Sequence, residues 1–206
     1  MNEVEIQEIK YGKKTADLTV DGQVYKKVSL EALVKCGISK GNLKADDFNK
    51  FLDLNEKLSA RDSLFNTLAR SSYKSEFGYR QKLKTKGFSK ESIDYAIDFA
   101  RQYGYIDDLK FATQFIETNK QKAGEFKLRY DLEKNRVPQD IIEKALSLAD
   151  INEESSCYLV LEKYLKSKPL NFKTKQKAYS ALASKGFSYE SINAALDKFD
   201  FKIDEE

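Results

Sequence analysis

The chain has no histidine and no tryptophan among its 206 residues, and only two prolines, two cysteines and one methionine. The absence of histidine removes the commonest general base, the Ser-His and Cys-His nucleophile pairs, and the commonest metal ligand. The sequence also lacks the P-loop, dinucleotide-binding, nucleophile-elbow and EF-hand patterns. We therefore expect a protein that is not an enzyme, with no catalytic residues, no metal site and no cofactor.

Long apolar runs and cysteine pairs are missing as well. No stretch approaches eighteen apolar residues, and the N-terminal MNEVEIQEIK carries acidic residues where a signal peptide has a basic and then an apolar segment. We therefore expect a cytoplasmic protein with no membrane partner. Cys36 and Cys157 lie far apart with no CxxC spacing, which favours two reduced thiols over a disulfide or a zinc site.

The first 45 residues differ in pattern from the rest of the chain. VEIQEI, ADLTV and VYKKV are β-branched stretches, and Asp21-Gly22 between the last two is a strong hairpin signal. SLEALVKC (29–36) begins with a serine cap and ends before Gly37, which predicts a short helix. Residues 1–45 are thus expected to form an extension with a β-hairpin and a short helix, and a helical pattern starts at about Ala45.

One phrase recurs along the helical part. LKTKGFSKESIDYAI (83–97) returns as LASKGFSYESINAAL (182–196) with nine of fifteen positions identical, and a weaker copy, LEKNRVPQDIIEKAL, covers 132–146. Apolar positions survive where polar ones drift, as expected if each copy buries the same face. The predicted buried positions are Leu83, Phe88, Ile93, Leu132, Val137, Ile142, Leu182, Phe187 and Ile192.

The recurring phrase predicts three three-helix repeats, at 46–105, 106–150 and 151–206, the last with an acidic tail. The expected fold is therefore mainly α: a tandem array of three three-helix repeats, elongated and curved, with a small β-containing N-terminal extension.

Glycines mark the predicted helix ends. Gly87, Gly104 and Gly186 stand where a left-handed residue ends a helix, and Asp107 is placed to cap the next helix. Arg136 occupies the position that glycine holds in the other two copies. Because a left-handed arginine costs about 1 kcal/mol more than glycine, the cap is expected to move to Asn135.

The net charge of +3 is unevenly distributed. Residues 70–137 carry +5 (15 basic against 10 acidic), and residues 160–187 carry +6 (7 against 1). Such patches can bind phosphates or acidic protein surfaces, although lysines often only solvate a surface. Tyr73, Tyr103, Tyr105 and Tyr130 lie at helical spacing and are expected in the core rather than stacked on bases. The candidate contact residues are Arg80, Lys82, Lys84, Lys86, Lys127, Arg129, Lys173, Lys175, Lys177 and Lys185.

Several stretches together resemble the RecX family of recombinase regulators. They are RQKLKTKGF (80–88), GYIDDLKFA (104–112), and Lys122-Ala123-Gly124 ahead of Leu128 and Leu132. The resemblance covers about residues 57–200. It departs from the family pattern at Glu125, where the family often has proline, and at Asn135-Arg136, where it usually has Lys-Gly.

The resemblance implies a non-enzymatic regulator of homologous recombination and DNA repair. It implies binding to the RecA nucleoprotein filament along its helical groove, with modulation of ATPase and strand-exchange activity and with inhibition the favoured direction. Single- and double-stranded DNA are further implied partners, and no small-molecule substrate is expected. Two alternatives stay open: a stand-alone helical nucleic-acid-binding module acting through the basic patches, and a structural adaptor for other proteins.

Overall fold

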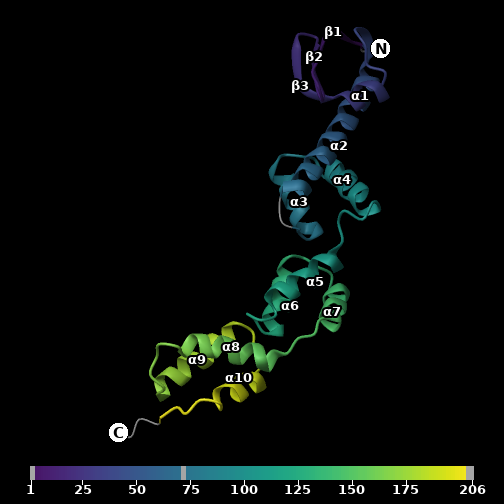
Figure 1. Cartoon of the computed structure of the whole chain (residues 1–206). Helices are drawn as coiled ribbons and strands as arrows, with labels where there is room; N and C mark the ends of the chain where they lie inside the picture. Colours follow the sequence, from purple (N-terminus) through teal and green to yellow (C-terminus); the bar gives the residue numbers. More distant parts are fainter. Residues whose placement is uncertain (1–2, 71–72, 203–206) are drawn as a thin grey trace. The chain divides into compact units, whose positions relative to one another are not determined.

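The computed structural model describes residues 3–70 and 73–202, so the end of the predicted acidic tail, 203–206, lies outside the described residues. The chain forms two compact units, Met1–Ile106 and Asp107–Glu206 (Figure 1). Within them the elements confirm the predicted mainly helical fold of three-helix repeats with a small N-terminal antiparallel sheet.

The N-terminal sheet has the strand order β3-β2-β1-β4, with every pair antiparallel. Its strands are β1 (Glu3–Tyr11), β2 (Thr15–Val20), β3 (Gln23–Ser29) and β4 (Gly41–Lys44). The predicted hairpin joins β2 to β3, and Asp21 (φ 48°) and Gly22 (φ 77°) both adopt the positive φ of a two-residue type I′ turn. The short β4, which pairs with β1, is not foreseen in the sequence.

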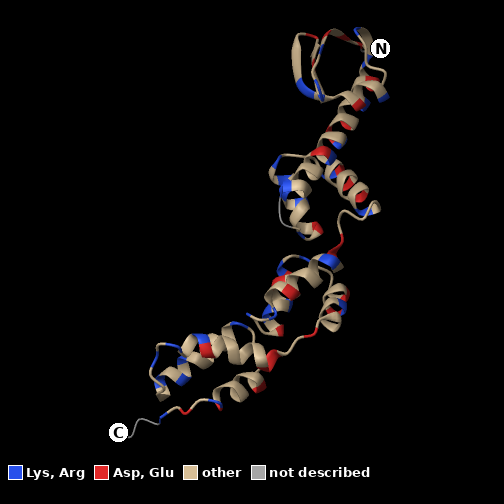
Figure 2. Cartoon of the chain, in the orientation of Figure 1, with Lys and Arg blue, Asp and Glu red and all other residues tan. Residues whose placement is uncertain are grey.

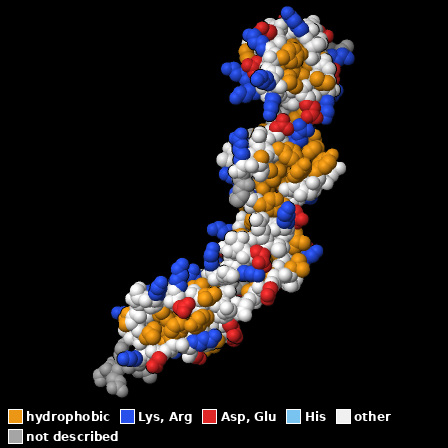
Figure 3. All heavy atoms as spheres, in the orientation of Figure 1, with side chains coloured by type: hydrophobic (Ala, Val, Ile, Leu, Met, Phe, Trp, Pro, Cys, Tyr) orange, Lys and Arg blue, Asp and Glu red, His pale blue; other side chains and the backbone are white. Residues whose placement is uncertain are grey.

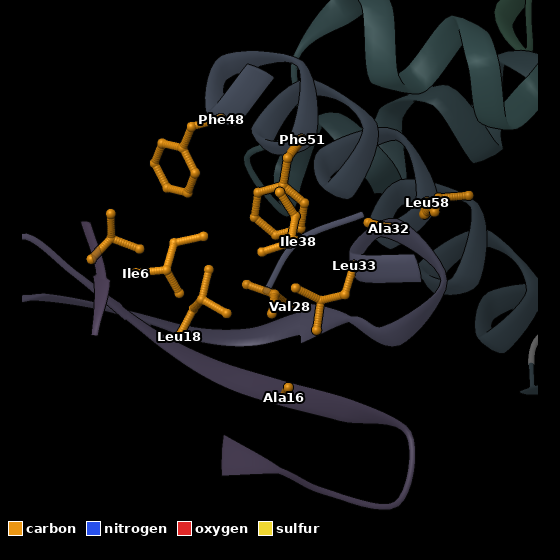
Figure 4. Packing of buried hydrophobic residues seen from close by; sticks show 11 residues of the cluster. Ile6, Ala16, Leu18, Val28, Ala32, Leu33, Ile38, Phe48, Phe51 and Leu58 are labelled. Carbon is orange, nitrogen blue, oxygen red and sulfur yellow. The ribbon is translucent and has the colours of Figure 1, made fainter. Parts of the chain in front are cut away.

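One face of this sheet is buried against helices α1 (Leu30–Lys35) and α2 (Ala45–Arg70). Period-2 alternation in the strands directs Ile6, Leu18 and Val28 to this face, where they pack with Phe48 and Phe51 of α2 (Figure 4). Phe51 and Leu18 are completely buried. The extension is therefore a small sheet-and-helix module with its own core.

Helix α2 serves two cores in the first unit. Its residues up to Leu58 supply Phe48, Phe51 and Leu58 to the sheet module, and the part that follows supplies Ala60 and Leu64 to the first repeat. In that repeat α2 packs with α3 (Glu76–Thr85) and α4 (Lys90–Gln102). The second core also contains Tyr79, Leu83, Ile93, Ala96, Ile97, Ala100 and Ile106, with Phe88 partly buried against it.

The second unit holds the second and third repeats. Their helices are α5 (Asp108–Asn119), α6 (Glu125–Lys134), α7 (Gln139–Leu148), α8 (Glu153–Leu165), α9 (Phe172–Ser184) and α10 (Tyr189–Leu196). Leu132, Val137 and Ile142 are buried in one core, and Leu182, Phe187 and Ile192 in the other. Cys36 and Cys157 are free thiols, and burial raises the pKa of Cys157 to about 11. None of the helices in the described part of the chain is long and apolar enough to cross a membrane.

The same turn ends the second helix of every repeat. Phe88 N–H donates to the carbonyl of Leu83, Val137 N–H to that of Leu132, and Phe187 N–H to that of Leu182, which is the 6→1 bond of a Schellman motif. The left-handed residue is Gly87 (φ 87°) in the first repeat and Gly186 (φ 76°) in the third.

The expected displacement of this turn onto Asn135 is wrong. Arg136 itself adopts the left-handed conformation (φ 56°), and Asn135 stays at φ −82°. Moving the cap would break the bonds from Val137 N–H to Leu132 and from Arg136 N–H to Glu133, which have lengths of 3.2 and 2.8 Å. Two hydrogen bonds and the burial of Val137 outweigh a backbone cost of about 1 kcal/mol.

Residues close in sequence also determine where α4 ends and α5 begins. Gly104 (φ 70°) ends α4, and Asp107 then caps α5 by accepting hydrogen bonds from Leu109 N–H (2.8 Å) and Lys110 N–H (3.0 Å).

The second and third repeats meet at a glycine pair. Gly124 N–H donates to the carbonyl of Lys185 at 3.0 Å, so the start of α6 lies against the turn between α9 and α10. The Glu153 carboxylate joins the same elements, because it accepts from Ser188 N–H (2.6 Å) and from Glu125 N–H (3.3 Å). The third repeat is therefore joined to the second by one backbone hydrogen bond and by one bond to the Glu153 side chain.

Replacing Glu31 of α1 with glutamine is expected to make the free energy of unfolding less dependent on acid pH. Hydrogen bonds from Arg61 (2.9 Å) and Lys35 (2.8 Å) lower the pKa of Glu31 to about 2. A carboxyl with a depressed pKa stabilises the fold above its unfolded pKa of about 4.5, and this stabilisation is lost as the pH falls toward 2. The side chain of Glu31 is 38% exposed, so solvent screening limits the contribution to about 1 kcal/mol.

The measurement compares urea unfolding of wild type and Glu31→Gln at pH 7, 4 and 3. The wild type should be the more stable protein at pH 7, and the difference should narrow at the lower values. A difference that stays constant with pH would contradict this assignment.

Candidate functional site

Two of the candidate basic residues join helices within their own repeats. Arg80 on α3 bonds through Nε to Glu76 Oε1 at 2.8 Å and through Nη1 to Asp94 on α4. Burial raises the pKa of Glu76, but hydrogen bonds from Arg101 and Arg80 outweigh it and hold that pKa below its ordinary value. Arg80 therefore links the second helix of the repeat to the third.

Arg129 repeats this arrangement 49 residues later. It bonds to Glu125 at 3.0 Å and to Glu143 on α7, and the Arg129 hydrogen bond lowers the pKa of Glu143. Lys127, another candidate, pairs with Asp131 at 2.6 Å and lies 5.0 Å from the ring centroid of Tyr130. In both repeats the arginine charge is matched locally by carboxylates.

The lysines of α3 are differently placed. Lys82 and Lys84 are exposed and form no ion pair with any residue that the structure describes. Lys86 at the end of the helix donates to Ser63 Oγ (2.6 Å) and Thr67 Oγ1 (3.4 Å) of α2, which fixes its position without neutralising it. In the described part of the first repeat, the ammonium groups of these three lysines are therefore not paired with a carboxylate.

The third repeat has a second group of such cations. Lys173, Lys177 and Lys185 are exposed, and within residues 3–70 and 73–202 no carboxylate pairs with them. Lys175 is half-buried, with its ammonium 5.8 Å from the ring centroid of Phe201. The basic positions on α3 and α9 are blue in Figure 2.

Three further lysines of the third repeat are not among the contact residues predicted from the sequence. Lys163, Lys166 and Lys168 line a cavity of about 730 Å³ beside Leu165, Leu170 and Phe199. In the sequence these three lysines count only as part of the net charge of +6 of residues 160–187. The expectation that the four tyrosines lie in the core is wrong for three of them, because Tyr103, Tyr105 and Tyr130 are 61%, 51% and 57% exposed.

The chemistry available to these residues is charge attraction. An unpaired ammonium on a helix surface attracts phosphate or carboxylate groups without a reaction step. Within the described ranges, no three His, Cys, Asp or Glu side chains lie close enough together to hold a metal ion.

Sequence comparison shows what the chain is similar to. A family model described as "RecX, third three-helix domain" matches residues 152–196. The "Regulatory protein RecX" of Clostridium botulinum strain Eklund 17B is 30% identical over 198 residues, which cover 93% of this chain and 92% of that protein. The protein of the same name from Clostridium perfringens strain SM101 is 31% identical over 172 residues, 81% of each chain.

Solved structures support the same fold. A chain described as "Crystal structure of regulatory protein RecX" superimposes with a TM-score of 0.69 at 20% identity, covering 94% of this chain and 99% of that one. The RecX of Lactobacillus salivarius superimposes with a TM-score of 0.60 at 21% identity, covering 71% of this chain and 99% of that one. At these identities the likeness concerns the fold alone.

Proposed function

This chain belongs to the RecX family of regulatory proteins, and from that membership we propose that it is a non-enzymatic regulator that binds the RecA nucleoprotein filament. In this proposal it inhibits the ATPase and strand-exchange activities of RecA and so regulates homologous recombination. The observation that carries the proposal is similarity along 93% of the chain to a protein named regulatory protein RecX.

The unpaired lysines supply a physical means of binding such a filament. A nucleoprotein filament offers DNA phosphates and acidic protein side chains. Lys82 and Lys84 on α3, and Lys173 and Lys177 on α9, can be attracted by either, because no carboxylate in the described ranges pairs with them. In this proposal α3 and α9 are the two contact helices.

The decisive experiment measures ATP hydrolysis by the cognate RecA on single-stranded DNA while this protein is titrated in. Direct binding of the protein to the same DNA is measured in parallel. Inhibition at concentrations where bare DNA is not bound would support action on the filament. An unchanged ATPase would contradict the proposal.

Reversing the charge of Lys82, Lys84 and Lys86 together is expected to weaken filament binding by about 10- to 100-fold. Each reversed surface contact is worth about 0.5 to 1 kcal/mol, and tenfold corresponds to about 1.4 kcal/mol. Binding is measured by pull-down on RecA filaments at low salt, where surface electrostatics is least screened.

The matched control is charge reversal of Lys13, Lys14 and Lys26, three exposed lysines of the sheet module. Both variants should unfold near the wild-type denaturant midpoint, because exposed substitutions change stability by about 0.5 kcal/mol or less. Equal filament affinity of the two variants would move the contact away from α3.

A stand-alone nucleic-acid-binding module is the second candidate function. It is favoured by the +5 and +6 segments together with the unpaired lysines. Such a protein binds DNA without RecA, and the logarithm of its affinity falls by about 0.7 to 0.9 per phosphate contact for each tenfold rise in salt. A flat salt response would exclude this function.

A further inference from the structure

The three repeats differ at one helix–helix contact. In the first two, an arginine on the second helix bonds to a glutamate four residues earlier and to a carboxylate fourteen residues later, in the triads Glu76–Arg80–Asp94 and Glu125–Arg129–Glu143. Fifty residues on from the second triad, the third repeat has Lys175, Tyr179 and Asn193. All the charges of the original network are therefore gone or reversed at this place.

The structure has an open groove where the triad is missing. A cavity of about 350 Å³ between α9 and α10 is lined by Lys175, Tyr179 and Asn193, together with Phe172, Gln176, Ser180 and Leu196. In the first two repeats the arginine and its carboxylates occupy the equivalent positions, and the first repeat has a cavity of about 280 Å³ beside Arg80, Phe88 and Ile93. The groove of the third repeat thus has no ion pair across it, and its lining combines Leu196 with the amide side chains of Gln176 and Asn193.

Aromatic rings border this groove, and two of them are exposed while Tyr179 is partly buried against the core of the repeat. Phe172 is 52% exposed and Tyr189 is 65% exposed, and the Tyr189 ring meets Tyr179 edge to face with centroids 6.5 Å apart. Figure 3 shows apolar side chains gathered over the third repeat, with both basic and acidic side chains around them. A patch of this kind on a protein surface commonly marks a binding site.

The charge on the α9 side of the groove has one sign, whereas α10 carries the exposed Glu190 and ends at the exposed Asp197. Helix α9 has three lysines, Lys173, Lys175 and Lys177, and no acidic residue. In the described part of the chain, none of the three is paired with a carboxylate. The α9 side of the groove therefore attracts an anion, and the neighbouring rings can contact an apolar or aromatic group.

We propose that the groove between α9 and α10 binds single-stranded nucleic acid, with a base stacked on Tyr179 or Phe172 and the neighbouring phosphates at Lys173 and Lys177. Aromatic rings combined with basic side chains are the general arrangement by which proteins hold single strands. Lys175 lines the groove itself, and Lys173 and Lys177 are exposed on the same helix. Gln176, Ser180 and Asn193 can donate and accept hydrogen bonds at a base edge. An acidic peptide would use the same lysines, but a shallow groove with half-exposed rings suits the flat face of a base better than a protruding side chain.

This inference rests on the DNA-binding part of the proposed function. Its test is fluorescence anisotropy of a labelled fifteen-residue oligo-dT titrated with the full chain. Tyr179→Ala and Phe172→Ala should each weaken binding roughly tenfold or more, since stacking contributes strongly for each base. Tyr179→Phe should keep most of the affinity for oligo-dT. An abasic oligonucleotide of equal length should bind the wild-type protein about as weakly as oligo-dT binds Tyr179→Ala.

Tyr130→Ala is the matched control, because Tyr130 is an exposed tyrosine beside a lysine in the second repeat. It should bind oligo-dT like the wild type. A further variant, Lys175→Glu/Tyr179→Arg/Asn193→Asp, installs the triad of the first repeat; it should remain folded and lose the binding. Unchanged affinity of Tyr179→Ala and Phe172→Ala, or binding of an acidic aromatic peptide in place of oligo-dT, would overturn the proposal.

The same variants separate this site from the filament function. If wild type inhibits the RecA ATPase but Tyr179→Ala binds oligo-dT normally, the groove proposal fails and the proposed function stands. If Tyr179→Ala loses oligo-dT while wild type never affects the ATPase, the groove stands and the filament function fails.

Discussion

Leu132→Ala is expected to lower the free energy of unfolding of the second unit by about 2 to 5 kcal/mol. Leu132 is completely buried, in a core with Ile116, Leu128 and Ile142. Leu132 also belongs to the Schellman turn, because its backbone carbonyl accepts a hydrogen bond from Val137 N–H. The side chains of Leu132 and Val137 lie in the same core. A truncation here leaves a cavity between all three helices of the repeat.

Because the chain has two compact units, a single unfolding transition cannot be assumed. Hydrogen exchange therefore accompanies urea denaturation, and amides of residues 107–206 should lose protection while those of the first unit keep it. The control is Leu148→Ala in the same repeat, since Leu148 is 64% exposed and should cost about 0.5 kcal/mol or less. Equal midpoints for wild type and Leu132→Ala would show that this residue does not hold the core together.

The repeats are accessible to sequence reasoning because their signals are local. The apolar spacing of Leu83, Phe88 and Ile93 and the glycine between two helices recur within fifteen residues. Such a pattern fixes which face is buried and where the chain turns. The pattern misleads at Arg136. Backbone propensity predicts that the helix cap moves to Asn135, but the hydrogen bonds of the turn keep Arg136 in the left-handed conformation.

The sheet module shows a limit of the same approach. The sequence predicts three strands and a hairpin. It does not predict β4, which has only four residues, Gly41–Lys44, and forms by pairing with β1 at the other end of the segment. Helix α2 has no glycine or proline from Ala45 to Arg70, which is consistent with one continuous helix. Its division between two cores depends on partners far away in sequence and could not be predicted.

Charged residues were the least predictable part of the candidate site. Arg80 and Arg129 look like exposed cations if only neighbours within one helix are considered. Their second partners, Asp94 and Glu143, lie fourteen residues away across the turn. The recurrence of an acidic residue at this distance in two repeats, and its absence in the third, is the signal that could have separated paired from unpaired positions.

Gly124→Ala is expected to destabilise the second unit by about 2 to 4 kcal/mol. Gly124 has φ −75°, which alanine adopts without strain, so the cost comes from contacts alone. A Cβ here would lie 2.1 Å from the carbonyl oxygen of Gly186 and 2.5 Å from Cα of Phe187. These are backbone atoms and cannot rotate away, so α6 must separate from the turn and lose the 3.0 Å bond to Lys185.

Two other glycines separate the clash from backbone strain. Gly87→Ala introduces only strain, because φ is 87° and nothing lies within 4 Å of the new Cβ, and it should cost about 1 kcal/mol. Gly186→Ala adds to similar strain a Cβ 2.3 Å from the Lys127 amide nitrogen, so it should cost more than Gly87→Ala. Urea denaturation followed by hydrogen exchange, which reads each unit separately, should show the smallest loss of stability for Gly87→Ala in the first unit. If Gly124→Ala unfolds like the wild type, the second and third repeats do not meet at Gly124 and Gly186. The junction described between these two repeats would then be wrong.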